Sequence, residues 1–428
     1  MRIEKLNPQL EKVLLDRRSR ADSQAHRVAA CICADVERRR DAAVLHWARK
    51  LDGNLVRSVR EMRIAESAIR ESKYSLAPDF LRGLAQAAQN IRAVARQQLP
   101  RPWKLQTARG VSIAQIVRPL ETVACYVPGG RFSLFSSLLM TAIPAQVAGV
   151  ERIVVVCPKP NAAVLAAANL LGLREVWQLG GAQAIAAFAY GTRTIPRAEM
   201  ICGPGNRYVA AAKSIVATHT KIDMLAGPTE LLVLAAEGDP RFIAADLIAQ
   251  AEHDPDAVPL LVTPSRSLAR AVQAEVALQL AALPDQNVAP RALRANGRIL
   301  LTPNFDSAIA FANRFAPEHL SIPEAGPSLL ARIRSAGSVF LGPWSAQPFG
   351  DYLTGSNHVL PTSGHARARG GLSTTDFVKC ITVQRVARQG ARRLARAAQV
   401  LAQSEGLLAH ARAATIRGTA SARPKGMQ

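Results

Sequence analysis

The feature that most constrains the fold of this chain is a regular alternation of short apolar runs with helical patterns through its middle. The alternating segments are 153–157, 162–171, 175–179, 182–190, 199–202 and 207–217. Short apolar strands that alternate with helices are typical of a parallel sheet covered by helices on both faces. This stretch therefore predicts a doubly wound α/β domain.

A second series with the same rhythm follows. Its strands are expected near 231–234, 260–263, 299–302, 319–322 and 338–341. The fold class predicted is α/β, with two doubly wound, incomplete Rossmann-like parallel-sheet domains and helical extensions at the N- and C-terminal ends.

The segments before the first series differ in pattern. Residues 1 to about 100 carry helical periodicity with many charges and few strand-like runs, which predicts a helical layer. Strands are expected at 113–117 and 123–127, and a helix at 134–148.

The segments after the second series also change character. Residues 343–373 are rich in Gly, Pro, Ser and Thr, which favours an irregular loop of a functional site over a spacer. A helical piece is expected at 387–417, followed by a polar tail that we expect to be frayed.

Composition narrows the class of protein. With 428 residues and 49% hydrophobic content, the chain is long enough for two or more domains. Six scattered cysteines, a start without an apolar secretory segment and no run of ~18 apolar residues predict a soluble, reduced, cytoplasmic protein without a membrane partner.

The net charge of +22 raises the question of nucleic acid. The arginines are spread along the chain, aromatic residues make up only 5%, and no basic-aromatic motif is visible. We therefore expect no nucleic-acid partner; the positive field can instead steer an anionic ligand such as a dinucleotide.

Three glycine-rich turns fall at strand-to-helix junctions of the first series, at 126–130, 180–183 and 203–206. Backbone N–H groups at such junctions bind phosphate favourably. None of the turns supplies the full dinucleotide fingerprint with its ribose-binding acid, so a cofactor contact and a structural tight turn both remain open.

Four segments of the C-terminal half carry metal-ligand and proton-transfer chemistry: Gln250-Ala-Glu-His253, Pro317-Glu318-His319, Gly350-Asp351-Tyr352 and Glu405-Gly-Leu-Leu-Ala-His410. Together they offer a carboxylate, two imidazoles and a side-chain carbonyl, which suit zinc, and an adjacent acid/base pair. Taken singly, each has a plain structural alternative, such as a helix-capping histidine or a surface acid beside a half-buried histidine.

Spacing supports part of this interpretation. Gln250 and His253 are three residues apart near the end of a predicted helix, so they share a face. Glu318 and His319 are neighbours at the entry to a short strand, where alternation aims them apart unless a turn bends the chain.

The wording and order of these segments resemble the histidinol dehydrogenase family from about residue 20 to residue 417. The resemblance also rests on these motifs: Tyr126-Val-Pro-Gly-Gly130, Gly180-Gly-Ala-Gln-Ala-Ile185, Gly203-Pro-Gly-Asn-Arg-Tyr-Val-Ala-Ala-Ala-Lys213, Ala226-Gly-Pro-Thr-Glu230, Ala316-Pro-Glu-His-Leu320 and Asn357-His-Val-Leu-Pro-Thr362. It implies an NAD-dependent enzyme with one Zn²⁺ per subunit that oxidises L-histidinol through the aldehyde to L-histidine, using two NAD per product. It also implies a homodimer with shared active sites.

Carried over by position, the resemblance implies a role for each matching residue. The implied zinc ligands are Gln250, His253, Asp351 and His410. The implied catalytic residues are His319, a general base, and Glu318, which activates water. The implied NAD contacts are Tyr126, Gln183 and Asn206. The implied substrate contacts are Thr229, Gln250, His253, His319, Asp351, Glu405 and His410.

The domain boundaries expected on this basis form four parts: an N-terminal helical tail at 1–22, a first α/β domain at 23–122 plus 230–370 with the helical layer and the zinc and catalytic residues, an NAD-binding Rossmann-like domain at 123–229, and a C-terminal helical segment at 371–428 that reaches the partner subunit.

Two departures from the family pattern keep an alternative open. Thr229 stands where many members have serine, and the amino-acid sequence of 370–376 is a variant of the family pattern. A relative that oxidises another small alcohol, such as sulfopropanediol, is therefore the nearest alternative. A basic nucleic-acid-binding protein without catalysis is a second alternative, which charge alone motivates.

Overall fold

The computed structural model describes residues 1–18, 22–53, 55–129, 134–225, 227–284, 286–324 and 326–420. The chain divides into two compact units. Unit 1 comprises Met1–Gln98 and Leu120–Phe377, and unit 2 comprises Leu99–Pro119 and Val378–Gln428. Among the described helices, none combines the length and the apolar character that crossing a membrane requires.

One half of unit 1 is built on a five-stranded parallel sheet with the order β6-β5-β4-β7-β8. Its strands are β4 (Thr122–Tyr126), β5 (Arg152–Val156), β6 (Val176–Trp177), β7 (Met200–Cys202) and β8 (Lys221–Ile222). The strand order reverses direction at β4. In an open α/β sheet such a reversal creates a crevice at the carboxyl ends of the strands, where ligands bind.

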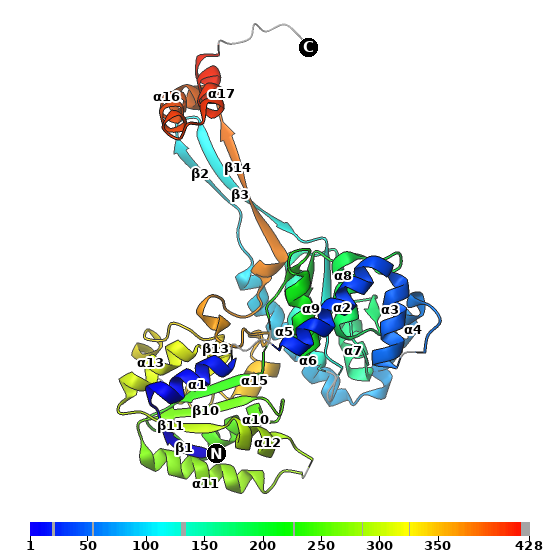
Figure 1. Ribbon diagram of the computed structural model, residues 1–428, viewed down its shortest axis with the longest axis vertical. Helices are drawn as coiled ribbons and strands as arrows, with labels where there is room; N and C mark the ends of the chain where they lie inside the picture. Colours follow the sequence, from blue (N-terminus) through cyan, green and yellow to red (C-terminus); the bar gives the residue numbers. More distant parts are fainter. Residues whose placement is uncertain are drawn as a thin grey trace. The chain divides into compact units, whose positions relative to one another are not determined.

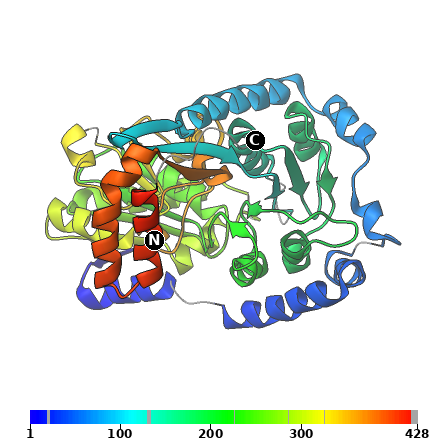
Figure 2. The ribbon, with the colours of Figure 1, turned by 90° about the horizontal axis from the view of Figure 1, so that it is seen from above.

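Helices cover both faces of this sheet. Successive strand residues point to opposite faces, and because both sets are apolar, both faces are buried. One face carries α2 (Ser23–Arg39), α3 (Asp41–Trp47), α8 (Gly181–Tyr190) and α9 (Arg207–Val216). The other carries α4 (Glu66–Glu71), α5 (Pro78–Gln98), α6 (Phe135–Ala148) and α7 (Ala162–Leu170). Figure 2 shows α2 in dark blue and α5 in lighter blue on opposite sides of the green strands.

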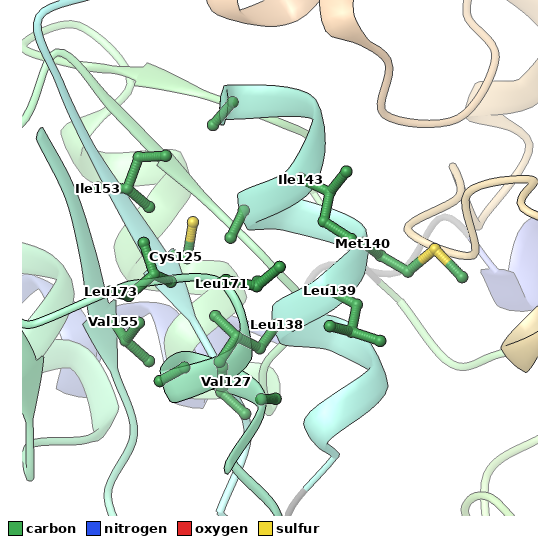
Figure 3. Packing of buried hydrophobic residues seen from close by; sticks show 14 of the residues in the cluster. Cys125, Val127, Leu138, Leu139, Met140, Ile143, Ile153, Val155, Leu171 and Leu173 are labelled. Carbon is green, nitrogen blue, oxygen red and sulfur yellow. The ribbon is translucent and has the colours of Figure 1, made fainter. Parts of the chain in front are cut away.

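The packing of α6 shows how this layer is held. Its residues from Leu138 to Ile143 are buried, so the helix is apolar around its whole circumference. Leu138 lies on the side of α6 that faces Val127 of the central strand region, and Leu139 lies on another side of the helix (Figure 3). Burial of each such side chain contributes about 1.5–3 kcal/mol relative to exposure.

The other half of unit 1 is built on a six-stranded parallel sheet with the order β1-β11-β10-β9-β12-β13. Its strands are β1 (Arg2–Lys5), β9 (Glu230–Leu234), β10 (Val258–Thr263), β11 (Arg298–Leu301), β12 (His319–Ile322) and β13 (Ser338–Leu341). One face packs on α10 (Pro240–Ala251), α11 (Arg266–Leu280) and α12 (Ala289–Ala295). The other packs on α1 (Pro8–Arg18), α13 (Phe305–Phe315) and α14 (Pro327–Leu330). The two predicted doubly wound parallel sheets are thus confirmed.

The first strand corrects the sequence interpretation. Residues 1 to about 100 were expected to be helical, yet β1 pairs in parallel with β11 along its whole length. Its sequence, Arg-Ile-Glu-Lys, has one apolar residue among charges, because an edge strand buries little of its surface. Such a strand has no apolar pattern by which it could be recognised.

Short helical segments complete unit 1: η1 (Ala48–Asp52), η2 (Val59–Met62), η3 (Ser72–Ser75), α15 (Gln347–Tyr352), η4 (His365–Arg367) and η5 (Thr374–Phe377). Of these, α15 and η4 lie in the region expected to be irregular. That expectation is therefore right for most of 343–373 but misses these two short helices, of which α15 carries Asp351.

Unit 2 is a three-stranded antiparallel sheet, β14-β3-β2, followed by two helices. Its elements are β2 (Trp103–Ala108), β3 (Val111–Pro119), β14 (Val378–Val386), α16 (Arg388–Ser404) and α17 (Leu408–Thr419). In Figure 1 the two helices lie side by side at one end of the sheet. The expected helical piece at 387–417 is confirmed, and the expected strand at 113–117 lies within β3. The strands β2 and β14 were missed because most of their residues are exposed and show no alternation. The tail expected to fray, 421–428, lies outside the described residues.

Candidate active site

A cavity of about 180 Å³ in unit 1 gathers chemistry from both of its sheets. Gly203 follows β7 and Asp223 follows β8, so the five-stranded sheet contributes its carboxyl ends. Thr229 precedes β9 and His319 begins β12, so the six-stranded sheet contributes its amino ends. Of the predicted site residues, the cavity lining contains Thr229, His253, Glu318, His319 and Asp351.

Glu318 and His319 both line this cavity, although they are neighbours in sequence. The backbone of Ala316, which ends α13, adopts a left-handed conformation with φ of 50°. This turn bends the chain before the strand begins, so the alternation of side chains does not separate the pair. His319 Nδ1 lies 3.5 Å from Glu318 Oε2.

Hydrogen bonds fix both side chains. Glu318 Oε2 accepts from the Thr229 hydroxyl at 2.6 Å and from the Glu230 amide N–H at 2.8 Å. His319 Nδ1 lies 3.0 Å from the Glu230 carbonyl oxygen, which can only accept, so Nδ1 carries a proton. His319 Nε2 is buried without a hydrogen-bond partner. In the neutral imidazole Nε2 carries no proton, so it is the nitrogen that can accept one.

The electrostatics of the pair are coupled. Burial by itself lowers the pKa of His319, but the charge and hydrogen bond of Glu318, with Asp351 and the Glu230 carbonyl, raise the pKa to about 9. Burial by itself raises the pKa of Glu318, while His319, the Thr229 hydroxyl and the Glu230 N–H together lower the pKa below its usual value. Both pKa shifts indicate that, when no other charge lies nearby, His319 is protonated and Glu318 is ionised, so the two side chains form a buried ion pair.

Three of the four predicted metal ligands come together beside this pair. Gln250 ends α10 and is fully buried; its amide donates to the Thr229 hydroxyl at 2.5 Å, and its Oε1 has no partner. His253 Nε2 lies 3.9 Å from Asp351 Oδ2. This separation is slightly longer than the roughly 3–3.5 Å between neighbouring ligand atoms on one zinc ion, given bonds of about 2.0–2.2 Å.

These donors fit a zinc ion chemically. An imidazole nitrogen and a carboxylate oxygen are common zinc ligands, and an unpartnered buried Oε1 is costly unless a cation or donor meets it. Asp351 Oδ2 also accepts from Gln347 Nε2 at 2.8 Å, as ligating carboxylates commonly do. Across the described ranges, no three His, Cys, Asp or Glu side chains cluster tightly enough to hold a metal without such an amide.

The remaining two predicted residues, Glu405 and His410, belong to unit 2. Glu405 follows α16 and His410 lies on α17, with Gly406 in a left-handed turn between the helices (φ of 77°). Both side chains are exposed on that unit. Their assignment as ligand and substrate contact stays a prediction.

A second cavity, of about 480 Å³, contains all three predicted dinucleotide contacts, Tyr126, Gln183 and Asn206. Tyr126 OH accepts from the Gly181 amide at 3.2 Å, and burial raises the pKa of this phenol. Asn206 caps α9 through bonds from the Tyr208 and Val209 amides. The size lies within the range of ligand sites, about 300–1,000 Å³.

Asp52 is an acid in this second cavity that sequence reasoning missed. Its Oδ2 accepts from the Gly180 amide at 3.2 Å and from Gln183 Nε2 at 3.1 Å. Burial raises the pKa of this carboxyl. Asp52 lies 131 residues before Gln183, so spacing downstream of the glycine turns could not point to it.

Gln347 and His358 were also not assigned a role, although both line the first cavity. His358 Nδ1 bonds to the Asp351 carbonyl at 2.9 Å, and burial lowers the pKa of its imidazole. His358 stands in a motif quoted above, so the motif itself was the available signal. Gln347 had no such signal, since α15 was not expected.

Comparisons with known proteins identify the family to which the chain belongs. A model of the family described as histidinol dehydrogenase matches residues 15–418. The chain is 45% identical over 396 residues to a histidinol dehydrogenase of Rhizobium meliloti, with 91% of each chain covered. It is 46% identical over 363 residues to one of Methanothermobacter thermautotrophicus, covering 83% of this chain and 85% of that protein.

A solved structure also resembles this fold. The crystal structure of a histidinol dehydrogenase from Elizabethkingia anophelis has a TM-score of 0.92 and 34% sequence identity, with 97% of this chain and 98% of that chain covered. Two glycine-turn motifs on which the sequence resemblance rests are only partly described, since Gly130 and Ala226 lie outside the described residues.

Proposed function

Because the chain belongs to the histidinol dehydrogenase family, we propose that it oxidises L-histidinol through L-histidinal to L-histidine with NAD and one zinc ion per subunit. The observation that carries this proposal is the buried, unpartnered Nε2 of His319 in a cavity that Thr229, His253 and Asp351 also line. Oxidation of an alcohol needs a proton acceptor at the reacting hydroxyl, and this nitrogen can take that role.

In the first step, His319 Nε2 accepts the proton of the substrate hydroxyl as a hydride leaves the same carbon. Nδ1 is held by the Glu230 carbonyl, so the ring cannot turn its protonated nitrogen toward the alcohol. The alcohol becomes the aldehyde, and NAD, when bound, supplies the hydride acceptor. General-base catalysis of this kind contributes about 10²–10⁴-fold.

In the second step, water adds to the aldehyde and the hydrate loses a second hydride. Glu318 is the carboxylate placed to take the proton from that water: His319, the Thr229 hydroxyl and the Glu230 N–H lower its pKa, so it is ionised and has a place for a proton. His319 again accepts the hydroxyl proton. Over the two steps, one hydride passes to each of two NAD molecules, and the product is a carboxylate.

Gln250, His253 and Asp351 would hold zinc, which would supply a Lewis-acid contact for the substrate. We propose a homodimer in which His410 of the partner subunit is the fourth ligand and Glu405 of the partner subunit binds the substrate ammonium. Tyr126, Gln183 and Asn206 would contact NAD. The six cysteines are all free thiols, which agrees with a reducing compartment such as the cytoplasm.

The test uses the purified protein with zinc, NAD and L-histidinol, and follows NADH. We expect two NADH for each L-histidine formed, and metal analysis should give one zinc per chain. Folded, zinc-loaded protein that forms no NADH from L-histidinol would overturn the proposal. A panel that includes sulfopropanediol separates this function from that of a related alcohol dehydrogenase.

A further inference from the structure

A second buried ion pair lines the first cavity and has no role in the steps above. Lys213 of α9 and Asp223 after β8 are 3% and 2% exposed. Lys213 Nζ donates to Asp223 Oδ1 at 2.6 Å and to the Gly203 carbonyl at 2.5 Å. Removal of two charges from water costs several kcal/mol per ion, which only a dense set of hydrogen bonds offsets.

The pair holds both backbone groups of one residue. Asp223 Oδ2 accepts from the Gly203 amide at 2.7 Å, while Lys213 takes the carbonyl of the same glycine. Gly203 has φ of 108°, and a Cβ there would lie 2.0 Å from the Tyr126 carbonyl oxygen. The turn after β7 is therefore fixed by side chains, in a conformation that only glycine adopts without strain.

This turn separates the two cavities. Gly203, Pro204 and Gly205 line the cavity with Glu318 and His319, whereas Asn206 and Tyr208 line the cavity with the predicted dinucleotide contacts. A dinucleotide bound in the second cavity must pass this turn for its reacting ring to meet a substrate in the first. A shift of the turn would change the position of the reacting ring relative to the substrate.

We infer that Lys213 and Asp223 are a positioning pair that sets the turn Gly203–Asn206 between the cavities and so aligns the dinucleotide's reacting ring with the substrate carbon. The pair touches neither reacting atom in this role; it acts through Gly203. The inference rests on the proposed function only for the identity of the two reactants. A misplacement of about 1 Å at such a point can cost about 10²-fold in rate.

The test compares Lys213→Met with the wild-type enzyme, using L-histidinol deuterated at the oxidised carbon. We expect kcat to fall about 10- to 100-fold and the isotope effect on kcat to increase, because hydride transfer becomes slower than product release. Zinc content and KM for L-histidinol should stay within about twofold of the wild-type values, since the metal donors lie elsewhere. Lys213→Arg, which keeps the charge and its donors, should restore part of kcat.

Arg152→Met is the matched control. Arg152 pairs with Glu175 at 2.9 Å at the opposite end of the same sheet, and it is about half exposed. This variant should keep the wild-type kcat and isotope effect. If Lys213→Met unfolds because Asp223 is left as an unpaired charge, the double variant Lys213→Met/Asp223→Asn is measured by the same criteria.

Two results separate the inference from its alternatives. A folded Lys213 variant with a lowered Tm but wild-type kcat and isotope effect would show that the pair only stabilises the fold, and would overturn the inference. If the wild-type protein forms no NADH from L-histidinol, the proposed function fails by itself. The pair is then tested by NADH titration: a change in the fluorescence of bound NADH in Lys213→Met supports the inference, and an unchanged spectrum and Kd overturn it.

Discussion

Two buried ion pairs face the same cavity, one from each sheet of unit 1, and they differ in what their hydrogen bonds leave open. The Lys213–Asp223 pair binds backbone at both of its carboxylate oxygens and through its ammonium. In the Glu318–His319 pair, the carboxylate and Nδ1 are held, but Nε2 has no partner. The first pair therefore resembles a scaffold and the second a reactive group.

The difference shows that burial of charge does not by itself mark a catalytic residue. A buried pair whose donors and acceptors are all used can only fix geometry, since any proton movement would break bonds that offset its desolvation. In a buried pair with one unpartnered ring nitrogen, that nitrogen can accept a proton when the imidazole is neutral and can release it again without breaking the other hydrogen bonds. The comparison is open to direct test.

The largest effect is expected from His319→Gln. Glutamine keeps a similar size and a donor for the Glu230 carbonyl but has no group that accepts a proton near neutral pH, so kcat should fall about 10³-fold. Zinc content, measured by metal analysis, should stay near the wild-type value. An equal loss of zinc would show that His319 is a ligand and that its free nitrogen was misinterpreted.

The next effect concerns pH and the stability of the metal-free protein. Because the pKa of His319 is raised from 6.5 to about 9, its stabilising contribution is complete below about pH 6.5 and is lost as pH rises through about 9. At 1.36 kcal/mol per pKa unit this loss is roughly 3 kcal/mol. Urea unfolding in chelator at pH 6 and pH 9.5 measures it.

The control for this pH effect is His319→Gln, whose free energy of unfolding should change much less between the two pH values than that of the wild-type protein. If the wild-type protein and His319→Gln lose the same stability between the two pH values, then another group titrates and the ion pair described here is not formed in solution.

A smaller effect is expected at Thr229, whose hydroxyl joins the two halves of the reactive site. The hydroxyl accepts from Gln250 Nε2 and donates to Glu318 Oε2. Because it holds the amide nitrogen of Gln250, it determines where the unpartnered Oε1 points. Thr229→Val, of similar shape without the hydroxyl, should lower zinc affinity and kcat about 10-fold each, as loss of a group that orients a ligand does.

Thr229→Ser is the matched control, since it keeps the hydroxyl and loses only the methyl group. We expect zinc affinity and kcat within about threefold of the wild-type values. Competition with a chelator of known zinc affinity gives the first quantity. Equal behaviour of the valine and serine variants would mean that the hydroxyl orients neither Gln250 nor Glu318.

The fold and the site were predictable to different degrees. Both parallel sheets follow from apolar runs such as 153–157, because buried strands leave a strong pattern. The exposed strands β1, β2 and β14 leave none. Local strength of burial, rather than the importance of an element, decides what a sequence pattern reveals.

The site shows the same limit in another form. Helical spacing predicts that Gln250 and His253 share a face, but the bond from Thr229 to Glu318 spans 89 residues. Asp52 reaches Gln183 across 131 residues, and nothing in the glycine turns points to it. Contacts made only by the topology of the sheets cannot be derived from spacing along the chain.

The smallest effect should come from two neighbouring thiols in the five-stranded sheet. Cys125 and Cys202 sit opposite each other on β4 and β7, with their Sγ atoms 3.9 Å apart, and both are fully buried. Burial raises the pKa of the Cys202 thiol, so it stays protonated and is a poor nucleophile. Neither thiol lines the cavity that holds Glu318 and His319.

Cys202→Ala therefore separates two routes for the aldehyde step. If Glu318 activates water, the variant should lose about 1 kcal/mol of stability through lost packing and keep kcat within about twofold. If the aldehyde instead forms a thiohemiacetal on this cysteine, the variant should stop at the first NADH. Counting NADH per L-histidinol consumed distinguishes the two routes: a value of two in the variant supports Glu318, and a value of one would place the chemistry of the second step at Cys202.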